Sequence, residues 1–334
     1  MLDTAAPVLD VADLKTIFRT RDGEVHAVNG VTFSIAPGEL LGVVGESGSG
    51  KSVTMMSLMG LLPMPPAEIV SGRILYNGTD VRGMSDEEMR QLRGKEIGFV
   101  FQDPMTSLNP VFTVGFQLME PLREHLGMDK QAARRRAAEL LALVGIPDAD
   151  ARLRDFPHQF SGGMRQRVMI AVALACDPKV LIADEPTTAL DVTIQAQILE
   201  LVKGLRRKLG MGIVWITHDL GVVAGIADRV MVMYGGQIVE HADVAELFAH
   251  PQHPYTRALL ETLPKVHGER AHRLRSIDGQ PPSLAKHPAS CPFAPRCRHA
   301  FERCLKENPS RVAVTERHDV ACWWDARTGE RRDA

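Results

Sequence analysis

No stretch of this sequence is long and apolar enough to cross a bilayer as a helix. A membrane-spanning helix needs about 20 mostly apolar residues, whereas the apolar runs here, such as Val168–Cys176 and Val180–Ala183, are far shorter. The first residues, from Met1 to Thr4, show neither the basic nor the apolar region of a secretory signal. We therefore expect a chain that does not span the membrane and stays in the cytoplasm.

The sequence also lacks a strong charge of either sign. Its formal net charge is −2, and its 24% charged and 45% hydrophobic residues are ordinary for a globular protein. The densest basic run, Arg134–Arg136, precedes Leu140, Leu141 and Val144 in a segment with helical spacing, so we interpret it as a solvated helix face. Bulk charge gives no reason to expect a nucleic-acid partner.

Cysteine is scarce, and its few copies are unevenly distributed. Of the five cysteines, Cys176 stands alone, and Cys291, Cys297, Cys304 and Cys322 all lie near the C-terminus. In a reducing compartment such residues are thiols or metal ligands rather than disulfides.

Length and periodicity predict one large domain with a smaller appendage in these 334 residues. Apolar or β-branched runs predict strands at Leu40–Val44, Ile97–Phe101, Val180–Ala183 and Ile213–Thr217. They alternate with helical stretches over residues 1–250, which is typical of an α/β fold with a mostly parallel sheet. A helical subdomain is expected at about 103–175. Prolines then predict an irregular C-terminal extension over 251–334.

The run from Gly45 to Ser52, with the sequence GESGSGKS, fits the pattern of a phosphate-binding loop between a strand and a helix. Glycines let backbone N–H groups converge on phosphate oxygens, Lys51 adds positive charge, and the Ser52 hydroxyl can bind Mg²⁺. The residues expected to bind ATP here are Gly45, Ser47, Gly48, Ser49, Gly50, Lys51 and Ser52.

Two adjacent acids, Asp184 and Glu185, follow the strand predicted at Val180–Ala183. Successive side chains of a strand point in opposite directions, so neighbouring carboxylates at its end can take different roles. We expect Asp184 to hold Mg²⁺ and Glu185 to act as the general base on the attacking water.

The segment Phe160–Arg167, with the sequence FSGGMRQR, resembles the signature sequence of ABC-type ATPases. The other motifs of that family stand around it in the family's order. Gln102 resembles the Q-loop glutamine, Thr188–Asp191 resembles the D-loop, and His218 resembles the switch histidine. The chain is identified by these motifs as a member of the ABC-type ATPases, which implies the fold of a P-loop NTPase.

The resemblance implies a mechanism shared between two chains. Two such domains would pair head to tail, so that Ser161, Gly162, Gly163 and Met164 serve the ATP held by a partner. Gln102 would touch Mg²⁺ and the water, and His218 would contact the γ-phosphate. Asp191 would belong to the D-loop. Phe18 is a candidate for stacking on adenine, with a place in the core as the competing interpretation.

Phe160 and Met164 depart from the usual signature, and this variant resembles the oligopeptide and dipeptide importer branch. Four further stretches resemble the same branch: Gln102–Pro110, Ala183–Val192, Thr217–Ala224 and His253–Tyr255. The resemblance implies an ATP-hydrolysing subunit on the cytoplasmic face of the membrane. Its partners would be two permease subunits, a second, paralogous ATPase and an extracytoplasmic solute-binding protein. A soluble ABC ATPase of DNA repair or of the ribosome is the alternative, and nickel chelates or haem precursors are alternative cargoes.

Cys291, Cys297, Cys304 and Cys322 are spaced C-x5-C-x6-C-x17-C, which is looser than the C-x2-C pairs of common zinc sites. Four thiolates in a wider cage suit a four-iron cluster, and some ATPases of the branch that the chain resembles carry one there. We rank a 4Fe-4S cluster first, zinc second and unliganded thiols third.

Overall fold

The structure, a computed structural model, describes residues 6–103, 107–188, 190–263 and 277–332. They fall into two compact units. Unit 1 is drawn from segments 1–8, 35–39 and 77–216, and unit 2 from segments 9–34, 40–76 and 217–334. Within the described residues, we find no helix that is long and apolar enough to cross a membrane.

Unit 1 contains a small parallel sheet and most of the helices. The strands of this sheet are β6 (Ile97–Val100), β7 (Val180–Asp184) and β8 (Gly212–Thr217), and unit 1 also contains the short strand β5 (Thr79–Asp80), which lies outside it. Its helices are α2 (Asp86–Gln91), α4 (Val114–Leu126), α5 (Lys130–Leu143), α6 (Ala149–Arg152), α7 (Gly162–Ala173) and α8 (Val192–Leu209), with the short turns η1 (Val81–Gly83), η2 (Leu92–Glu96) and η3 (Pro157–Gln159).

The strands β6, β7 and β8 are parallel neighbours, which confirms the predicted type of sheet. In the register of these pairs, Ile97 lies opposite Val180, and Val180 lies opposite Gly212. All residues of β7 and β8 are buried, as expected for continuous apolar runs in a parallel sheet covered on both faces. The carboxyl ends of these strands therefore lie at one edge, where the polar residues Gln102 and Asp184 follow or end a strand.

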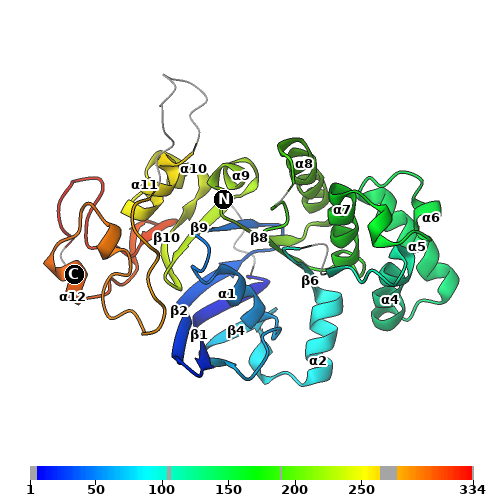
Figure 1. Ribbon diagram of the computed structural model, residues 1–334, viewed down its shortest axis with the longest axis horizontal. Helices are drawn as coiled ribbons and strands as arrows, with labels where there is room; N and C mark the ends of the chain where they lie inside the picture. Colours follow the sequence, from blue (N-terminus) through cyan, green and yellow to red (C-terminus); the bar gives the residue numbers. More distant parts are fainter. Residues whose placement is uncertain (1–5, 104–106, 189, 264–276, 333–334) are drawn as a thin grey trace. The chain divides into compact units, whose positions relative to one another are not determined.

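The helices of unit 1 begin at residues whose side chains cap them. Thr113, Asp129, Ser161 and Asp191 each accept a hydrogen bond from a backbone N–H in the first turn of the helix that follows. The helices α4, α5 and α6 lie together beside α7 (Figure 1). Unit 1 thus places a helical region between β6 and β7, where the sequence predicts one.

Unit 2 contains the longest strands and the C-terminal part of the chain. Its strands are β1 (Leu9–Thr20), β2 (Gly23–Ile35), β3 (Leu40–Val44), β4 (Ala67–Tyr76), β9 (Arg229–Tyr234), β10 (Gln237–Asp243), β11 (Val312–Thr315) and β12 (His318–Val320). Its helices are α1 (Lys51–Leu58), α9 (Leu220–Ile226), α10 (Val244–Ala249), α11 (Pro254–Glu261) and α12 (Glu302–Lys306), with the turn η4 (Ala294–Arg296).

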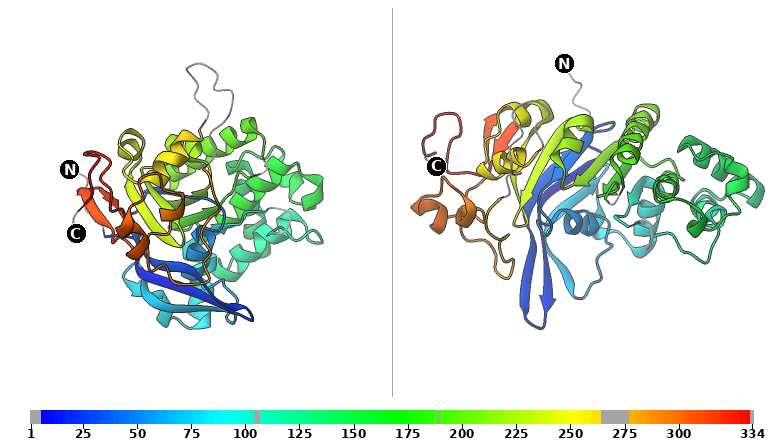
Figure 2. Two further views of the ribbon diagram at one scale, coloured as in Figure 1. Left: turned by 60° about the vertical axis from the view of Figure 1, so that its left-hand side comes forward. Right: turned by 45° about the horizontal axis from the view of Figure 1, so that its top comes forward.

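Two sets of strands build unit 2. The strands β1 and β2 form a long hairpin (Figure 2), and β1 also pairs antiparallel with β4. In the second set, β3 runs parallel to β9, with Leu41 opposite Arg229. A turn at Gly235 and Gly236 then reverses the chain into β10, which pairs antiparallel with β9.

The C-terminal region is more regular than its prolines predict. The strand β12 pairs antiparallel with β10, and β11 pairs with β12, so this region extends the sheet that contains β9 and β3. Pro254 does not interrupt a helix because it stands in the first turn of α11, where its missing N–H is not needed. The strands β11 and β12 and the helix α11 therefore correct the expectation of an irregular extension at these positions.

A buried carboxylate, that of Glu240 on β10, joins three parts of unit 2. Its oxygens accept hydrogen bonds from the backbone N–H groups of Gln252 (2.6 Å) and His253 (2.8 Å), just before α11. The Nε2 atom of His318, on β12, lies 2.8 Å from the same carboxylate, and both side chains are fully buried. The carboxylate therefore fixes both α11 and β12 to β10.

We predict that Glu240→Ala lowers the free energy of unfolding by about 3–5 kcal/mol, because it leaves buried donors without a partner. The measurement is urea unfolding followed by circular dichroism. Glu302→Ala is the control, since the Glu302 side chain is 80% exposed and pairs only at the surface with Lys306. Equal unfolding midpoints for the two variants would contradict the prediction.

Candidate functional site

The loop at residues 45–52 connects β3 to α1 in unit 2, and its two end glycines leave no room for a side chain. A Cβ atom on Gly45 would lie 2.3 Å from the carbonyl oxygen of Met233, and one on Gly50 would lie 2.5 Å from that of Ala27. Both glycines have positive φ, of 154° and 99°. The tight curl of this loop therefore requires glycine at both positions.

Lys51 and Ser49 are the polar residues of the loop that are buried. The Lys51 side chain is buried, and its Nζ donates to the carbonyl oxygens of Gly45 (2.8 Å) and Glu46 (2.9 Å). Ser49 Oγ is buried and has no hydrogen-bond partner within the described part of the chain. Ser47 and Gly48 are exposed at the tip, where a Cβ on Gly48 would meet open space. A ligand rich in oxygen atoms could satisfy such donors.

The loop is anchored from outside as well as from within. The Gly236 N–H donates to the carbonyl oxygen of Ser49 (3.0 Å), and the Glu46 N–H donates to the hydroxyl of Tyr255 on α11 (2.8 Å). Burial raises the pKa of Tyr255 well above its ordinary value, so this hydroxyl stays protonated. The carboxylate of Glu46 binds the guanidinium of Arg296. These contacts fix the first half of the loop.

In unit 1, the strand β7 ends in the acid pair. Asp184 is buried, with 4% of its surface exposed, whereas Glu185 is half-buried. Glu185 has a φ of 45°, a left-handed conformation that costs a non-glycine residue about 1–2 kcal/mol. Its N–H donates to the carbonyl oxygen of Ile216 in β8 (3.0 Å).

The structure brings Gln102 and Thr188 to the carboxylate of Glu185. Gln102 Nε2 donates to Glu185 Oε2 (3.2 Å), and Thr188 Oγ1 donates to the same oxygen (3.0 Å). These two hydrogen bonds fix the position of the carboxylate oxygen that a general base would use. The sequence placed Thr188 only within the D-loop, so its contact with Glu185 was missed.

The signature segment begins the helix α7 of unit 1. Ser161 caps the helix by accepting the N–H of Met164 (3.3 Å), and both Ser161 and Gly162 are exposed. A Cβ on Gly163 would lie 2.7 Å from Cγ2 of Ile194 in α8, so the two helices approach closely here. The exposed start of α7 presents backbone N–H groups, which carry partial positive charge and favour an anionic ligand.

Asp191 caps α8 by accepting the N–H of Ile194 (2.9 Å). Of the predicted D-loop, Ala189 lies outside the described residues, as do residues 104–106 of the predicted Q-loop stretch. In unit 2, His218 is exposed just after β8, and Asp219 next to it caps α9.

Phe18 lies on β1 opposite Ala67 and is half-buried rather than part of the core. The strand β1 contacts α1 in the same unit, where Thr16 and Ser57 share a hydrogen bond of 2.9 Å. A role of Phe18 in stacking on adenine stays a prediction.

The four C-terminal cysteines form a cluster of thiols in unit 2. Cys291, Cys304 and Cys322 are buried, and the Cys291 N–H donates to the carbonyl oxygen of Cys304 (3.0 Å). Burial, together with the smaller effect of the neighbouring cysteines, raises the pKa of Cys291 to about 11 and that of Cys322 to about 12. Cys176 lies apart, against the carbonyl oxygen of Pro121.

Backbone N–H groups point at three of these sulfurs. Cys291 accepts from Phe293 and Ala294, Cys297 accepts from His299, and Cys322 accepts from Trp324, the last at 3.4 Å. Within the described residues, however, no three His, Cys, Asp or Glu side chains are arranged so that they could hold a metal ion.

Two family profiles match the chain. The one described as ABC transporter matches residues 28–188, and the one described as oligopeptide/dipeptide transporter, C-terminal region, matches residues 239–304. The second profile ends at Cys304 and so includes the first three cysteines of the cluster.

Relatives match nearly the full length of the chain. It is 54% identical over 316 residues to the oligopeptide transport ATP-binding protein OppD of Bacillus subtilis (strain 168), which covers 95% of this chain and 88% of that protein. It is 52% identical to the dipeptide transport ATP-binding protein DppD of the same organism, over 95% of this chain and 94% of that protein.

A solved structure resembles the larger part of the fold. It is a dimeric, post-hydrolysis state of the ATP-binding cassette MJ0796 bound to ADP and Pi. The match has a TM-score of 0.64 and 28% sequence identity, and it covers 71% of this chain and 98% of that one.

Proposed function

This chain belongs to the family of oligopeptide and dipeptide transport ATP-binding proteins of ABC transporters, and from that membership we propose that it hydrolyses ATP to energise peptide import. The observation that carries the proposal is the 54% sequence identity to an oligopeptide transport ATP-binding protein over 95% of the chain. The chain would act as a peripheral subunit on the cytoplasmic face of the membrane.

The loop at residues 45–52 binds the phosphates of ATP in this proposal. Lys51 Nζ now bonds two carbonyl oxygens of its own loop, and phosphate oxygens would compete for the same ammonium group. The orphaned Ser49 hydroxyl supports an oxygen-rich ligand at this loop. Ser52, Asp184 and Gln102 would hold Mg²⁺, because a hydroxyl, a carboxylate and an amide oxygen are hard donors that suit this ion. When bound, Mg²⁺ neutralises charge on the phosphates.

Glu185 is the proposed general base. Gln102 and Thr188 hold its carboxylate, which would accept a proton from the attacking water. His218 would contact the γ-phosphate as the switch histidine. The general base therefore has a fixed position before any nucleotide arrives.

The signature residues serve a nucleotide on a second ATPase chain. Their exposure at the start of α7, with Ser161 and Gly162 uncovered, supports this role because they are free to meet another molecule. Asp191, at the start of α8, would lie at the same interface. We propose that the second chain is a paralogous ATPase and that each nucleotide is shared between the two chains.

Membrane permease subunits are the partners that the peptide-import family implies. An exposed apolar patch just before and within α4 supports a docking surface there: Val111 is 70% exposed, and the rings of Phe112 and Phe116 stack 4.6 Å apart. We propose that cytoplasmic loops of the permeases dock on this patch, since an exposed apolar patch marks a surface for another protein. A solute-binding protein would deliver the peptide outside the membrane.

The four C-terminal thiols would hold a 4Fe-4S cluster, with zinc as the alternative. What supports the cluster is the burial of Cys291, Cys304 and Cys322 together with the N–H groups that point at sulfur. Such hydrogen bonds stabilise thiolates and tune the clusters that they hold. Cys291, Cys297, Cys304 and Cys322 would be the ligands.

We predict that Glu185→Gln keeps ATP affinity but lowers ATP turnover about 100-fold or more, because the base is lost while the binding loop is intact. Lys51→Ala instead weakens ATP binding roughly 10- to 100-fold, since a charge-assisted contact is removed. Calorimetry and phosphate release measure the two quantities in the assembled complex. Glu200→Gln, at an exposed position of α8, and Lys203→Ala, at a half-buried one, are the controls. Parental turnover in Glu185→Gln would refute the assigned base.

We predict that anaerobically purified protein is brown and contains about four irons per chain, as a four-iron cluster requires. Cys304→Ser should lose this iron and its absorption in the blue, whereas Cys176→Ser, which changes the cysteine outside the cluster, should keep both. A colourless parent protein with stoichiometric zinc would reverse the order of the two candidates.

A further inference from the structure

Arg296 binds Glu46 through a two-pronged ion pair that spans 250 residues of sequence. Its Nη1 donates to Oε2 of Glu46 (2.6 Å), and its Nη2 donates to Oε1 (3.0 Å). The Arg296 side chain is 4% exposed, and that of Glu46 is 27% exposed. Paired, nearly buried contacts of this kind fix both orientation and distance.

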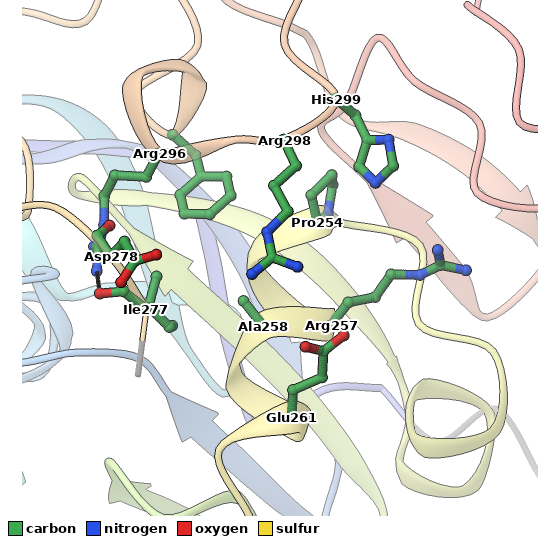
Figure 3. Close-up of a pocket in the computed structure, with 10 residues that line it drawn as sticks. Pro254, Arg257, Ala258, Glu261, Ile277, Asp278, Arg296, Arg298 and His299 are labelled. Atoms are coloured by element: carbon green, nitrogen blue, oxygen red, sulfur yellow. Dashed lines mark hydrogen bonds between the residues drawn. The ribbon is translucent and has the colours of Figure 1, made fainter. Parts of the chain in front are cut away.

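Every N–H of the Arg296 guanidinium has a partner. Besides the two bonds to Glu46, Nε donates to the carbonyl oxygen of Asp278 (2.9 Å), Nη2 to that of Ile277 (3.0 Å), and Nη1 to the hydroxyl of Tyr234 (3.2 Å). Figure 3 shows Arg296 turned toward Ile277 and Asp278, whereas Arg298 points toward α11. Five donors with five acceptors leave the group no other orientation of equal energy.

Aromatic rings hold the same arginine and connect it to α11. The Arg296 guanidinium lies 5.8 Å from the ring centre of Tyr234 and 6.0 Å from that of Phe293. The Tyr255 ring packs against both of these rings, at 4.5 Å and 5.3 Å. Tyr255 is also the residue whose hydroxyl accepts the Glu46 N–H. Tyr255 therefore binds the backbone of Glu46, and Arg296 binds its side chain.

Glu46 in turn contacts Lys51, the lysine proposed to bind the phosphates. Its carbonyl oxygen accepts a hydrogen bond from Lys51 Nζ, so a shift of residue 46 changes where that ammonium group points. A loop that must present several N–H groups to one anion binds it more tightly when its backbone is already fixed. The contacts of Arg296 act on that backbone and not on the nucleotide.

We propose that Arg296 is a positioning residue of the ATP site, through which the C-terminal extension holds the phosphate loop in its binding conformation. The inference rests on the proposed role of the loop at residues 45–52. It assigns to the extension a part in ATP affinity, in addition to any role of its cysteines.

The test is the ATP dissociation constant, measured by calorimetry with Mg²⁺ and ATP on the full chain carrying Glu185→Gln, so that hydrolysis does not interfere. We expect Arg296→Met and Glu46→Gln each to weaken ATP binding about tenfold, the ratio for losing one charge-assisted hydrogen bond. The double variant should be no weaker than either single one, since the two side chains act as one unit. Arg296→Lys should recover only part of the affinity, because lysine has no fork.

Arg298→Met is the matched control, because it also removes an arginine adjacent to Cys297 but one that points toward α11. Its ATP affinity should stay within about twofold of the parent, as expected for a surface change. Circular dichroism at the temperature of the titration establishes that each variant is folded. If Arg296→Met does not fold, Glu46→Gln still tests the pair from its more exposed side.

Parental affinity in folded Arg296→Met or Glu46→Gln, or effects that add in the double variant, would overturn the proposal. An equal loss in Arg298→Met would do the same. Lys51→Ala in the same series distinguishes the phosphate-binding role of the loop from the positioning role of Arg296. If Lys51→Ala keeps parental affinity, the assignment of the loop fails; if only the Arg296 and Glu46 variants keep it, the positioning role alone fails.

Discussion

The conformation of the phosphate loop is the constraint on which the rest of unit 2 depends. Gly45 and Gly50 have no space for a Cβ atom because backbone oxygens of Met233 and Ala27 stand against them. Those oxygens belong to β9 and β2, so the strands around the loop define its curl. A ligand site made of backbone N–H groups works only if this curl exists before the ligand arrives.

The contacts that hold the loop connect one residue to the next, from Glu240 through His253 to Tyr255. The buried carboxylate of Glu240 binds the backbone of Gln252 and His253, and this sets the start of α11. Burial lowers the pKa of His253 to about 4, so its neutral Nδ1 accepts the N–H of Tyr255 and caps the helix. Tyr255 then reaches the loop through its hydroxyl. The C-terminal part of the chain therefore contacts the phosphate loop of unit 2 directly.

Local signals predicted much of this architecture, and long-range contacts could not be predicted. The run Leu40–Val44 is both the predicted and the observed strand, because a short apolar run before a glycine loop has few other structures open to it. Asp184 and Glu185 were placed by the same kind of signal, because they follow the short apolar run Val180–Ala183. Nothing near residue 46 in the sequence points to Arg296, since ion-pair partners 250 residues apart carry no spacing rule. Strands β11 and β12 were missed because they are short and pair with β10 only through the tertiary fold.

Peptide import energised by ATP is the central claim, and transport in a reconstituted membrane tests it most directly. The full complex, with permeases, the second ATPase and a binding protein, would be placed in vesicles, and uptake of a labelled peptide would be followed with and without ATP. We expect uptake that requires ATP and that stops when this chain carries Glu185→Gln. Peptide uptake that continues with that variant, or without ATP, would contradict the claim.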